Sequence, residues 1–251
     1  MAFITSPLEQ FSIIRYIPIR IGIFDFSFTN TSVTMFLIIS LLLFVYWCSF
    51  DRGGRLVPTV VQSSTEMIYA FIRGVIEDQV GKDGKKYEAF ILSVFLFVLA
   101  CNMFGMIPYA FTVTSHIAVT FALSMSIFIG VTTIGLLKHG LHFFSFFWPS
   151  GAPLALAPLL VPLEIVSYSF RSISLGVRLF ANMMAGHTLV HILAGFSWSM
   201  AMAGGLLLPG ALIPFGIVFA LTGLELGVGI LQAYVFTILT CIYLKDVLEL
   251  H

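Results

Sequence analysis

Residues 211–244 read ALIPFGIVFALTGLELGVGILQAYVFTILTCIYL, an almost uninterrupted apolar run. As one helix with a rise of about 1.5 Å per residue, this run is roughly 50 Å long, whereas the hydrocarbon core of a bilayer is about 30 Å thick. No proline follows Pro214, so nothing in the run predicts a break. We therefore expect a single membrane helix that is steeply inclined to the bilayer normal.

A second overlong run comes just before this one. Residues 153–198 are also apolar, and their three prolines lie near the start, where a helix tolerates them. We expect a helix from Glu164 to about Phe196, joined to the last helix by a short glycine-rich turn. Together, residues 153–246 predict a long inclined hairpin.

The composition places the whole chain in a membrane. Of its 251 residues, 59% are hydrophobic and 10% are charged, which is far from the composition of a soluble domain. The 12 basic and 12 acidic residues cancel, so no basic surface indicates a nucleic-acid partner. We expect an all-α integral membrane protein that contacts the lipid bilayer.

Shorter runs predict the remaining elements. Three of them match the length of a single crossing: residues 33–50, 89–107 and 117–137, the last two forming a helical hairpin over 87–138. Residues 58–81 have apolar positions at helical spacing but carry too many charges to span, so we expect an amphipathic surface helix. Residues 1–32 form an N-terminal arm. The total is about five membrane-embedded helices and one surface helix.

The distribution of Lys and Arg predicts the orientation. Six of these residues separate the first two spans, whereas the turn near 107–116 has none. Lys138 follows the third span, the turn of the long hairpin has none, and Lys245 lies near the C-terminus. Basic connections stay on the inner side of a membrane, so the C-terminus is expected on that side.

Four charged side chains lie within the long hairpin: Glu164, Arg171, Arg178 and Glu225. A charge at the bilayer centre costs about 2.5–3.5 kcal/mol, so these groups must face protein or water. The first three are seven residues apart and share one helix face. Glu164 is expected to help neutralise Arg171, for which a structural ion pair is an open alternative. Arg178 has no acid within two turns, which favours a fixed positive charge with a functional role.

Polar residues continue along the same helix through Asn182, His187 and His191, and Gln232 follows Glu225 by seven residues. His187 and Glu225 can exchange protons once their surroundings shift their affinities. A hydrogen-bonded interior histidine is the alternative for His187. His187 and His191 have the i, i+4 spacing of a zinc pair, but the glutamate of H-E-x-x-H is missing, so the metal prediction is weak. We expect no cofactor.

Several motifs resemble subunit a of F-type ATP synthases, and together they cover nearly the whole chain. They are SLGVRLFAN at 174–182, AGH at 185–187, Glu225 followed by LQAYVF at 231–236, GMIPY at 105–109, KHG at 138–140 and YLKD at 243–246. The stretch SPLEQF at 6–11 is most similar to mitochondrial members. Bacterial relatives often have an acidic residue where His187 stands and a histidine where Glu225 stands, and this difference also favours a mitochondrial protein. The resemblance implies a multi-pass protein of the mitochondrial inner membrane whose C-terminus lies in the matrix.

The resemblance also implies a function and residue roles. The chain would be a proton-translocating stator subunit with no catalytic chemistry of its own, coupling proton flow to ATP synthesis. Its partners would be the ring of c subunits, the peripheral stalk and other membrane subunits. Arg178 would face the ring carboxylate, and Glu164 would belong to the matrix-side half-channel. Asn182, His187, Glu225 and Gln232 would line the outer half-channel, with Arg171 and His191 in supporting positions.

Three other classes of function remain open on the sequence. An autonomous proton or ion carrier would use the same buried charges but usually shows an internal repeat, which we do not find. A membrane metalloenzyme would use His187 and His191. A purely structural subunit would not need an aligned row of ionisable groups. No G-x-x-x-x-G-K-S/T motif is present, so ATP chemistry would take place on other chains.

Overall fold

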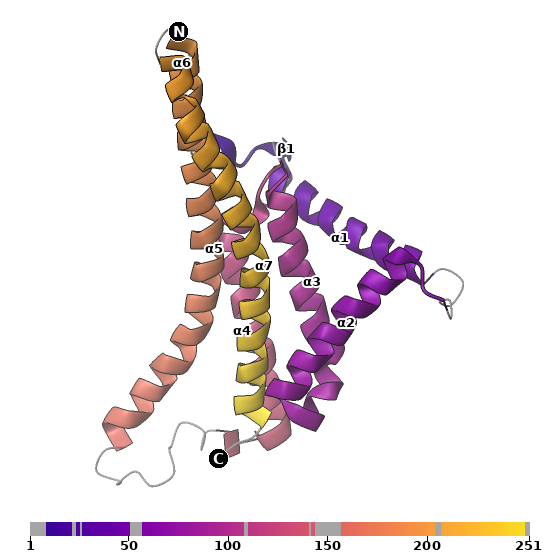
Figure 1. Cartoon of the computed structure of the whole chain (residues 1–251). Helices are drawn as coiled ribbons and strands as arrows, with labels where there is room; N and C mark the ends of the chain where they lie inside the picture. The colour runs from indigo at the N-terminus through magenta and orange to yellow at the C-terminus, as the bar shows by residue number, and fades with distance from the viewer. Residues whose placement is uncertain are drawn as a thin grey trace.

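The computed structural model describes residues 9–21, 24–25, 27–50, 57–107, 110–140, 142–143, 157–203 and 207–248. Within these ranges, five helices are long and apolar enough to cross a membrane. They are α1 (Asn30–Ser49), α3 (Glu88–Gly105), α4 (Ile117–His139), α5 (Ala157–Ala203) and α7 (Leu212–Leu248) (Figure 1). The prediction of an all-α membrane protein with about five embedded helices is confirmed.

The shorter elements connect these helices. They are η1 (Glu9–Phe11), α2 (Val60–Gln79), η3 (Gly81–Tyr87), η4 (Val113–Ser115) and α6 (Leu207–Gly210). Part of the N-terminal arm, the start of the long hairpin at 153–156, and Pro108 and Tyr109 lie outside the described residues.

The N-terminal arm contains two small antiparallel strand pairs that the sequence did not predict. β1 (Arg15–Ile17) pairs with β4 (Phe28–Thr29), and β2 (Arg20–Ile21) pairs with β3 (Phe24–Asp25). The side chain of Asn30 holds the arm against the start of α1, since its Nδ2 donates to the Ser12 carbonyl at 3.1 Å. These strands are too short to show a readable alternation of apolar and polar residues.

The helices α5 and α7 form the long hairpin and pack against each other. They contain 47 and 37 residues, which correspond to about 70 and 55 Å. α5 begins at Ala157 and passes through Pro162, so the expected start at Glu164 was too late. Pro162 lies in the second turn and removes one helical hydrogen bond without ending the helix. Figure 1 shows the N-terminal part of α5 diverging from the other helices.

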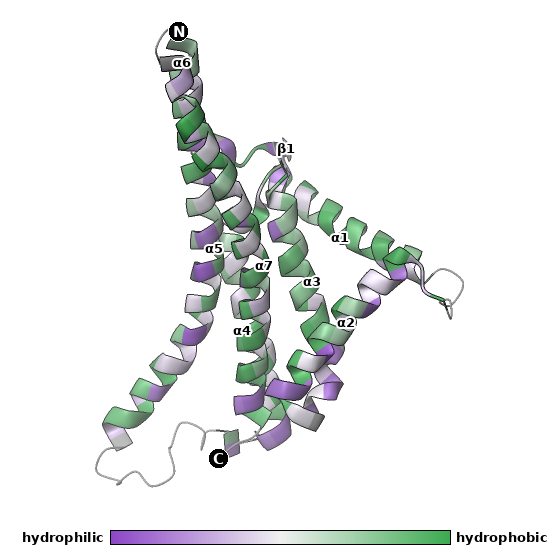
Figure 2. Cartoon of the chain, viewed as in Figure 1, coloured by the Kyte–Doolittle hydropathy of each residue, from purple (hydrophilic) through white to green (hydrophobic). Residues whose placement is uncertain are grey.

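The helix α2 is amphipathic and is not among the candidate spans of the described chain. Ile72, Val75 and Ile76 are buried against the bundle, whereas Arg73 and Glu77 are exposed and form an ion pair at 3.3 Å. Figure 2 shows hydrophilic residues on α2 and η3, in contrast to the mostly hydrophobic α1 and α3. This alternation explains why α2 packs on one side only.

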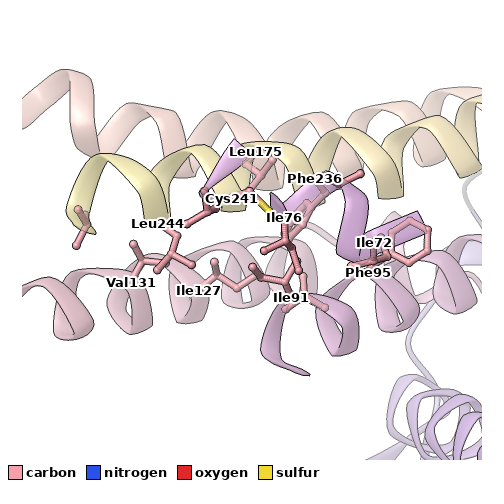
Figure 3. Close-up of a cluster of buried hydrophobic side chains, with 14 of the residues drawn as sticks. Ile72, Ile76, Ile91, Phe95, Ile127, Val131, Leu175, Phe236, Cys241 and Leu244 are labelled. Atoms are coloured by element: carbon pink, nitrogen blue, oxygen red, sulfur yellow. The ribbon is translucent and has the colours of Figure 1, made fainter. Parts of the chain in front are cut away.

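The apolar core joins α2, α3, α4, α5 and α7 (Figure 3). Its largest fully buried side chains include Phe236, Leu244, Ile76 and Ile91. α4 and α5 approach closely at Gly176, where a Cβ atom would lie 2.5 Å from the Ser124 hydroxyl oxygen. A small residue here lets the two backbones meet, as is common between membrane helices.

Charged groups join three elements at one end of the bundle. Lys138, at the end of α4, lies 3.8 Å from Asp83 of η3 and donates to the Leu248 carbonyl of α7 at 3.2 Å. The end of α7 therefore lies on the same side as the lysine-bearing η3. This side is the one opposite the α6 turn of the long hairpin (Figure 1).

Candidate functional site

Four polar residues meet in the contact between α5 and α7. We refer to them as the polar cluster: Asn182, His187, Glu225 and Gln232. His187 Nε2 lies 3.5 Å from Glu225 Oε1, and the side chains are 19% and 7% exposed. Asn182 Nδ2 donates to Gln232 Oε1 at 2.9 Å. Glu225 and Gln232 are seven residues apart on α7, and Asn182 and His187 are five residues apart on α5. Each residue of the cluster therefore contacts one residue on the other helix.

The contact between His187 and Glu225 depends on Gly186. A Cβ atom at this position would lie 2.7 Å from Glu225 Oε1, which is closer than real contacts allow. The glycine therefore lets the carboxylate lie against the backbone of α5. Its position directly before His187 was noted only as part of a motif, and sequence spacing alone did not show its steric role.

The polar cluster includes buried atoms without protein hydrogen-bond partners. Among the described residues, Glu225 Oε1 and Gln232 Nε2 have none. At 3.5 Å, the contact of Glu225 with His187 has the length of an ion pair rather than of a hydrogen bond. Buried polar atoms are almost always satisfied, so these two atoms are free to bind water or a group from another chain.

Asn102 of α3 extends the polar surroundings of the cluster. Its side chain is fully buried, and its Nδ2 donates to the Gly229 carbonyl of α7 at 3.0 Å. The sequence reasoning missed this residue, although a lone amide inside the apolar run 89–107 was a usable signal.

Arg178 lies on the exposed side of α5, one turn before Asn182. Among the described residues it forms no ion pair. A guanidinium remains charged at every physiological pH. The arrangement therefore presents a fixed positive charge beside the polar cluster and outside the packed core.

Arg171 has a different environment from the one expected. Its Nη1 lies 3.2 Å from Asp246 Oδ2 of α7, and the Tyr243 hydroxyl donates to the Arg171 carbonyl at 3.2 Å. Arg171 pairs with Asp246 instead of being neutralised by Glu164, because seven residues separate Glu164 and Arg171 by about 10 Å along the helix. Glu164 is half-buried near the start of α5.

His191 is exposed one turn after His187. Within the described residues, no group of three or more His, Cys, Asp or Glu side chains could hold a metal ion. His187 instead directs Nε2 toward Glu225 and toward the hydroxyl of Thr112, at 3.5 and 3.3 Å. His187 thus faces a hydroxyl group and a carboxylate.

The connection between α3 and α4 contacts the polar cluster at Thr112, whose Oγ1 lies 3.3 Å from His187 Nε2. His116, at the end of this connection, stacks on Phe111 with ring centroids 5.1 Å apart, and burial lowers its pKa from the ordinary value of 6.5. The imidazole is therefore neutral near pH 7. Nothing in the sequence singled out this connection as part of the site.

The comparisons with known proteins agree with this geometry. The family model described as ATP synthase A chain matches residues 31–245. This chain belongs to the ATP synthase A chain family. It is 59% identical to ATP synthase subunit a of Marchantia polymorpha, over 98% of this chain and 99% of the relative. It is 56% identical to that of Brassica napus (98% and 97% covered) and 51% identical to that of Chondrus crispus (99% and 98% covered).

Membership of this family establishes the general role. Members of the ATP synthase A chain family translocate protons in the membrane sector of the synthase, and the chain has partners within that sector. The buried Glu225 and Gln232 suit this role, and so does Arg178, which has no ion-pair partner among the described residues. Neither the comparisons nor the described geometry favours an autonomous carrier.

Proposed function

We propose that the polar cluster forms part of an outer half-channel and that Arg178 separates it from an inner half-channel, both of which serve a rotating ring of c subunits. The observation that carries the proposal is the position of Arg178: exposed on α5, without an ion-pair partner in the described chain, and one turn from Asn182. A fixed charge in this position needs an anionic partner outside the chain.

The surface beside Arg178 suits a second membrane helix. A shallow groove on α5 is lined by Phe180, Ala181, Met184, Ala185 and Thr188. Small residues such as alanine let helices approach closely in a membrane. A carboxylate on the approaching helix would supply an anion for Arg178.

The outer half-channel uses His187 and Glu225 as proton-exchanging groups. Both lie in the contact of α5 with α7, and their facing atoms are 3.5 Å apart. Asn182 and Gln232 continue the polar surface toward Arg178. Protons would thus leave the α5–α7 contact past Asn182 and Gln232 toward Arg178, which lies on the face of α5 opposite His187.

The inner half-channel begins near Glu164 and the ion pair of Arg171 with Asp246. These groups lie toward the N-terminal half of α5 and the C-terminal end of α7, on the side of η3. Because the two polar regions lie on opposite sides of Arg178 along α5, a proton cannot pass directly between them without meeting a positive charge.

Coupling follows from the cost of a bare charge in lipid. A ring carboxylate that has taken a proton from the outer half-channel is neutral and can face lipid. After it releases that proton on the inner side, it is an anion again and is attracted to Arg178. Each proton moved along a potential of 100 mV supplies about 2.3 kcal/mol to rotation.

We further propose a mitochondrial inner-membrane location with the C-terminus in the matrix. Lys138 and the lysines of η3 lie at the same end of the bundle as the C-terminal end of α7. Connections rich in Lys and Arg remain on the inner side of a membrane. The similarity of residues 6–11 to mitochondrial members supports the same location, although these residues lie partly outside the described chain. The peripheral stalk and the ring would be partners there.

Arg178→Ala tests the proposal. In vesicles that contain the complete synthase, this variant is expected to abolish ATP synthesis and to alter passive proton flux, because the two half-channels lose the charge between them. Arg73→Ala on α2 is the matched control, since Arg73 is exposed and paired within its own helix. ATP synthesis at the normal rate in Arg178→Ala would overturn the proposal.

A further inference from the structure

Residues 112–115, in the connection after α3, are buried, which is unusual for a link between membrane helices. Thr112, Val113, Thr114 and Ser115 are each at most 5% exposed. The connection packs against α1, α3, α4 and α5. It brings one hydroxyl group, that of Thr112, into contact with the polar cluster.

The contacts of Thr112 restrict the state of His187. Thr112 Oγ1 lies 3.4 Å from the Gly105 carbonyl oxygen and 3.3 Å from His187 Nε2. A carbonyl oxygen can only accept, so the hydroxyl donates to Gly105. In that arrangement the hydroxyl oxygen accepts from His187 when Nε2 carries a hydrogen. The same nitrogen faces Glu225 Oε1 at 3.5 Å.

We propose that Thr112 is a positioning residue that holds the Nε2–H edge of His187 toward Glu225. The inference rests on the proposed proton exchange between these two side chains. When His187 is an imidazolium, it gives its Nε2 proton to the Glu225 carboxylate, which leaves a neutral imidazole and a carboxylic acid. The hydroxyl hydrogen of Thr112 can then turn toward the bare Nε2, so this nitrogen has a partner before and after the transfer.

Gly105 supports this role for Thr112. A Cβ atom on Gly105 would lie 2.7 Å from Thr112 Cγ2 and 3.2 Å from Thr112 Oγ1. The end of α3 is therefore shaped to let the threonine approach. The contacts of 3.3–3.4 Å are long for hydrogen bonds, as is common for proton-transfer groups in the resting state.

Three variants separate the hydroxyl of Thr112 from its shape. Thr112→Val keeps the shape and removes the hydroxyl, whereas Thr112→Ser keeps the hydroxyl. Gly105→Ala displaces Thr112 without changing it. The matched control is Thr240→Val, because Thr240 is fully buried and donates to the Phe236 carbonyl of its own helix at 2.9 Å.

The measurement is the ATP-synthesis rate per assembled complex, with the complete synthase in liposomes. We expect Thr112→Val to lower the rate about tenfold, the factor that corresponds to one lost hydrogen bond to a charged group. Thr112→Ser and Thr240→Val should stay within about twofold of the unmodified protein, and Gly105→Ala should resemble Thr112→Val. If Thr112→Val assembles poorly, the rate of Gly105→Ala tests the positioning role of Thr112 instead.

Glu225→Gln in the same series distinguishes a failure of the proposed half-channel from a failure of the role of Thr112. If Glu225→Gln abolishes synthesis while Thr112→Val behaves like Thr240→Val, the role of Thr112 is overturned and the proposed half-channel stands. If Thr112→Ser is as impaired as Thr112→Val, the effect belongs to packing and the inference fails. If Glu225→Gln retains synthesis, both the half-channel and the role of Thr112 are overturned.

Discussion

The helix α7 takes part in two buried contacts of opposite character. Around Phe236 and Leu244, it packs with α2, α3 and α4 into a core of apolar side chains (Figure 3). At Glu225 and Gln232, it meets α5 through polar groups, two atoms of which have no hydrogen-bond partner in the described chain. The apolar contact fixes the position of α7, and the polar cluster uses that position to hold exchangeable groups next to α5.

The two contacts differ in what burial accomplishes. In the apolar core, almost all buried side chains are hydrocarbon, so close packing dominates the stability. In the polar cluster, burial removes competing water and strengthens each electrostatic interaction. A rigid neighbour is needed because proton transfer is sensitive to small displacements. Substitutions in the two regions should therefore alter different quantities.

The apolar core should show the largest effect on stability. Phe236→Ala is expected to destabilise the protein by about 3–5 kcal/mol through the cavity it leaves. The temperature at which the detergent-solubilised synthase dissociates measures this loss. Phe219→Ala is the control, because Phe219 is 81% exposed in the chain. Equal dissociation temperatures for the two variants would show that the region around Phe236 is not the scaffold.

The polar cluster should lose activity with little change in stability. Gly186→Ala pushes the Glu225 carboxylate away from α5 and is expected to lower ATP synthesis about tenfold to a hundredfold, as displaced reacting groups do. Gly195→Ala on the same helix is the control, because nothing lies within 4 Å of the added Cβ atom. A normal rate in Gly186→Ala would mean that the close approach of Glu225 to α5 is dispensable.

The smallest stability effect is expected at the ion pair between Arg171 and Asp246. The two side chains are 41% and 33% exposed, and pairs of this kind contribute about 0.2–1 kcal/mol. Asp246→Asn should therefore shift the dissociation temperature only slightly, and the shift should shrink at high salt. A shift as large as that of Phe236→Ala would mean that this ion pair stabilises the fold as much as the apolar core does.

The sequence predicted the helices well because run length is a local property. The runs at 33–50, 89–107 and 117–137 each became one helix, and the run beginning at 211 became α7. Pro162 misled the prediction for α5, since proline in the second turn costs one hydrogen bond but does not end a helix. The short strands of the N-terminal arm gave no periodic signal.

The candidate site was only partly readable. The spacing of Glu225 and Gln232, and the row from Arg178 through Asn182 to His187, identified residues on each helix separately. Which atoms meet depends on the register of the α5–α7 contact, and Gly186 influences that register through its missing side chain. The pairing of Arg171 with Asp246 and the contact of Thr112 with His187 join residues more than 70 positions apart, so no local pattern could reveal them.

The most direct test of the central claim is the passive proton flux through the membrane sector after the soluble sector is removed. A potassium diffusion potential drives the flux, and Glu225→Gln is compared with Glu66→Gln, a change at an exposed acid on α2. We expect Glu225→Gln to reduce the flux to the level of vesicles without the complex, whereas Glu66→Gln should leave it unchanged. Full flux in Glu225→Gln would contradict the claim that protons pass through the polar cluster.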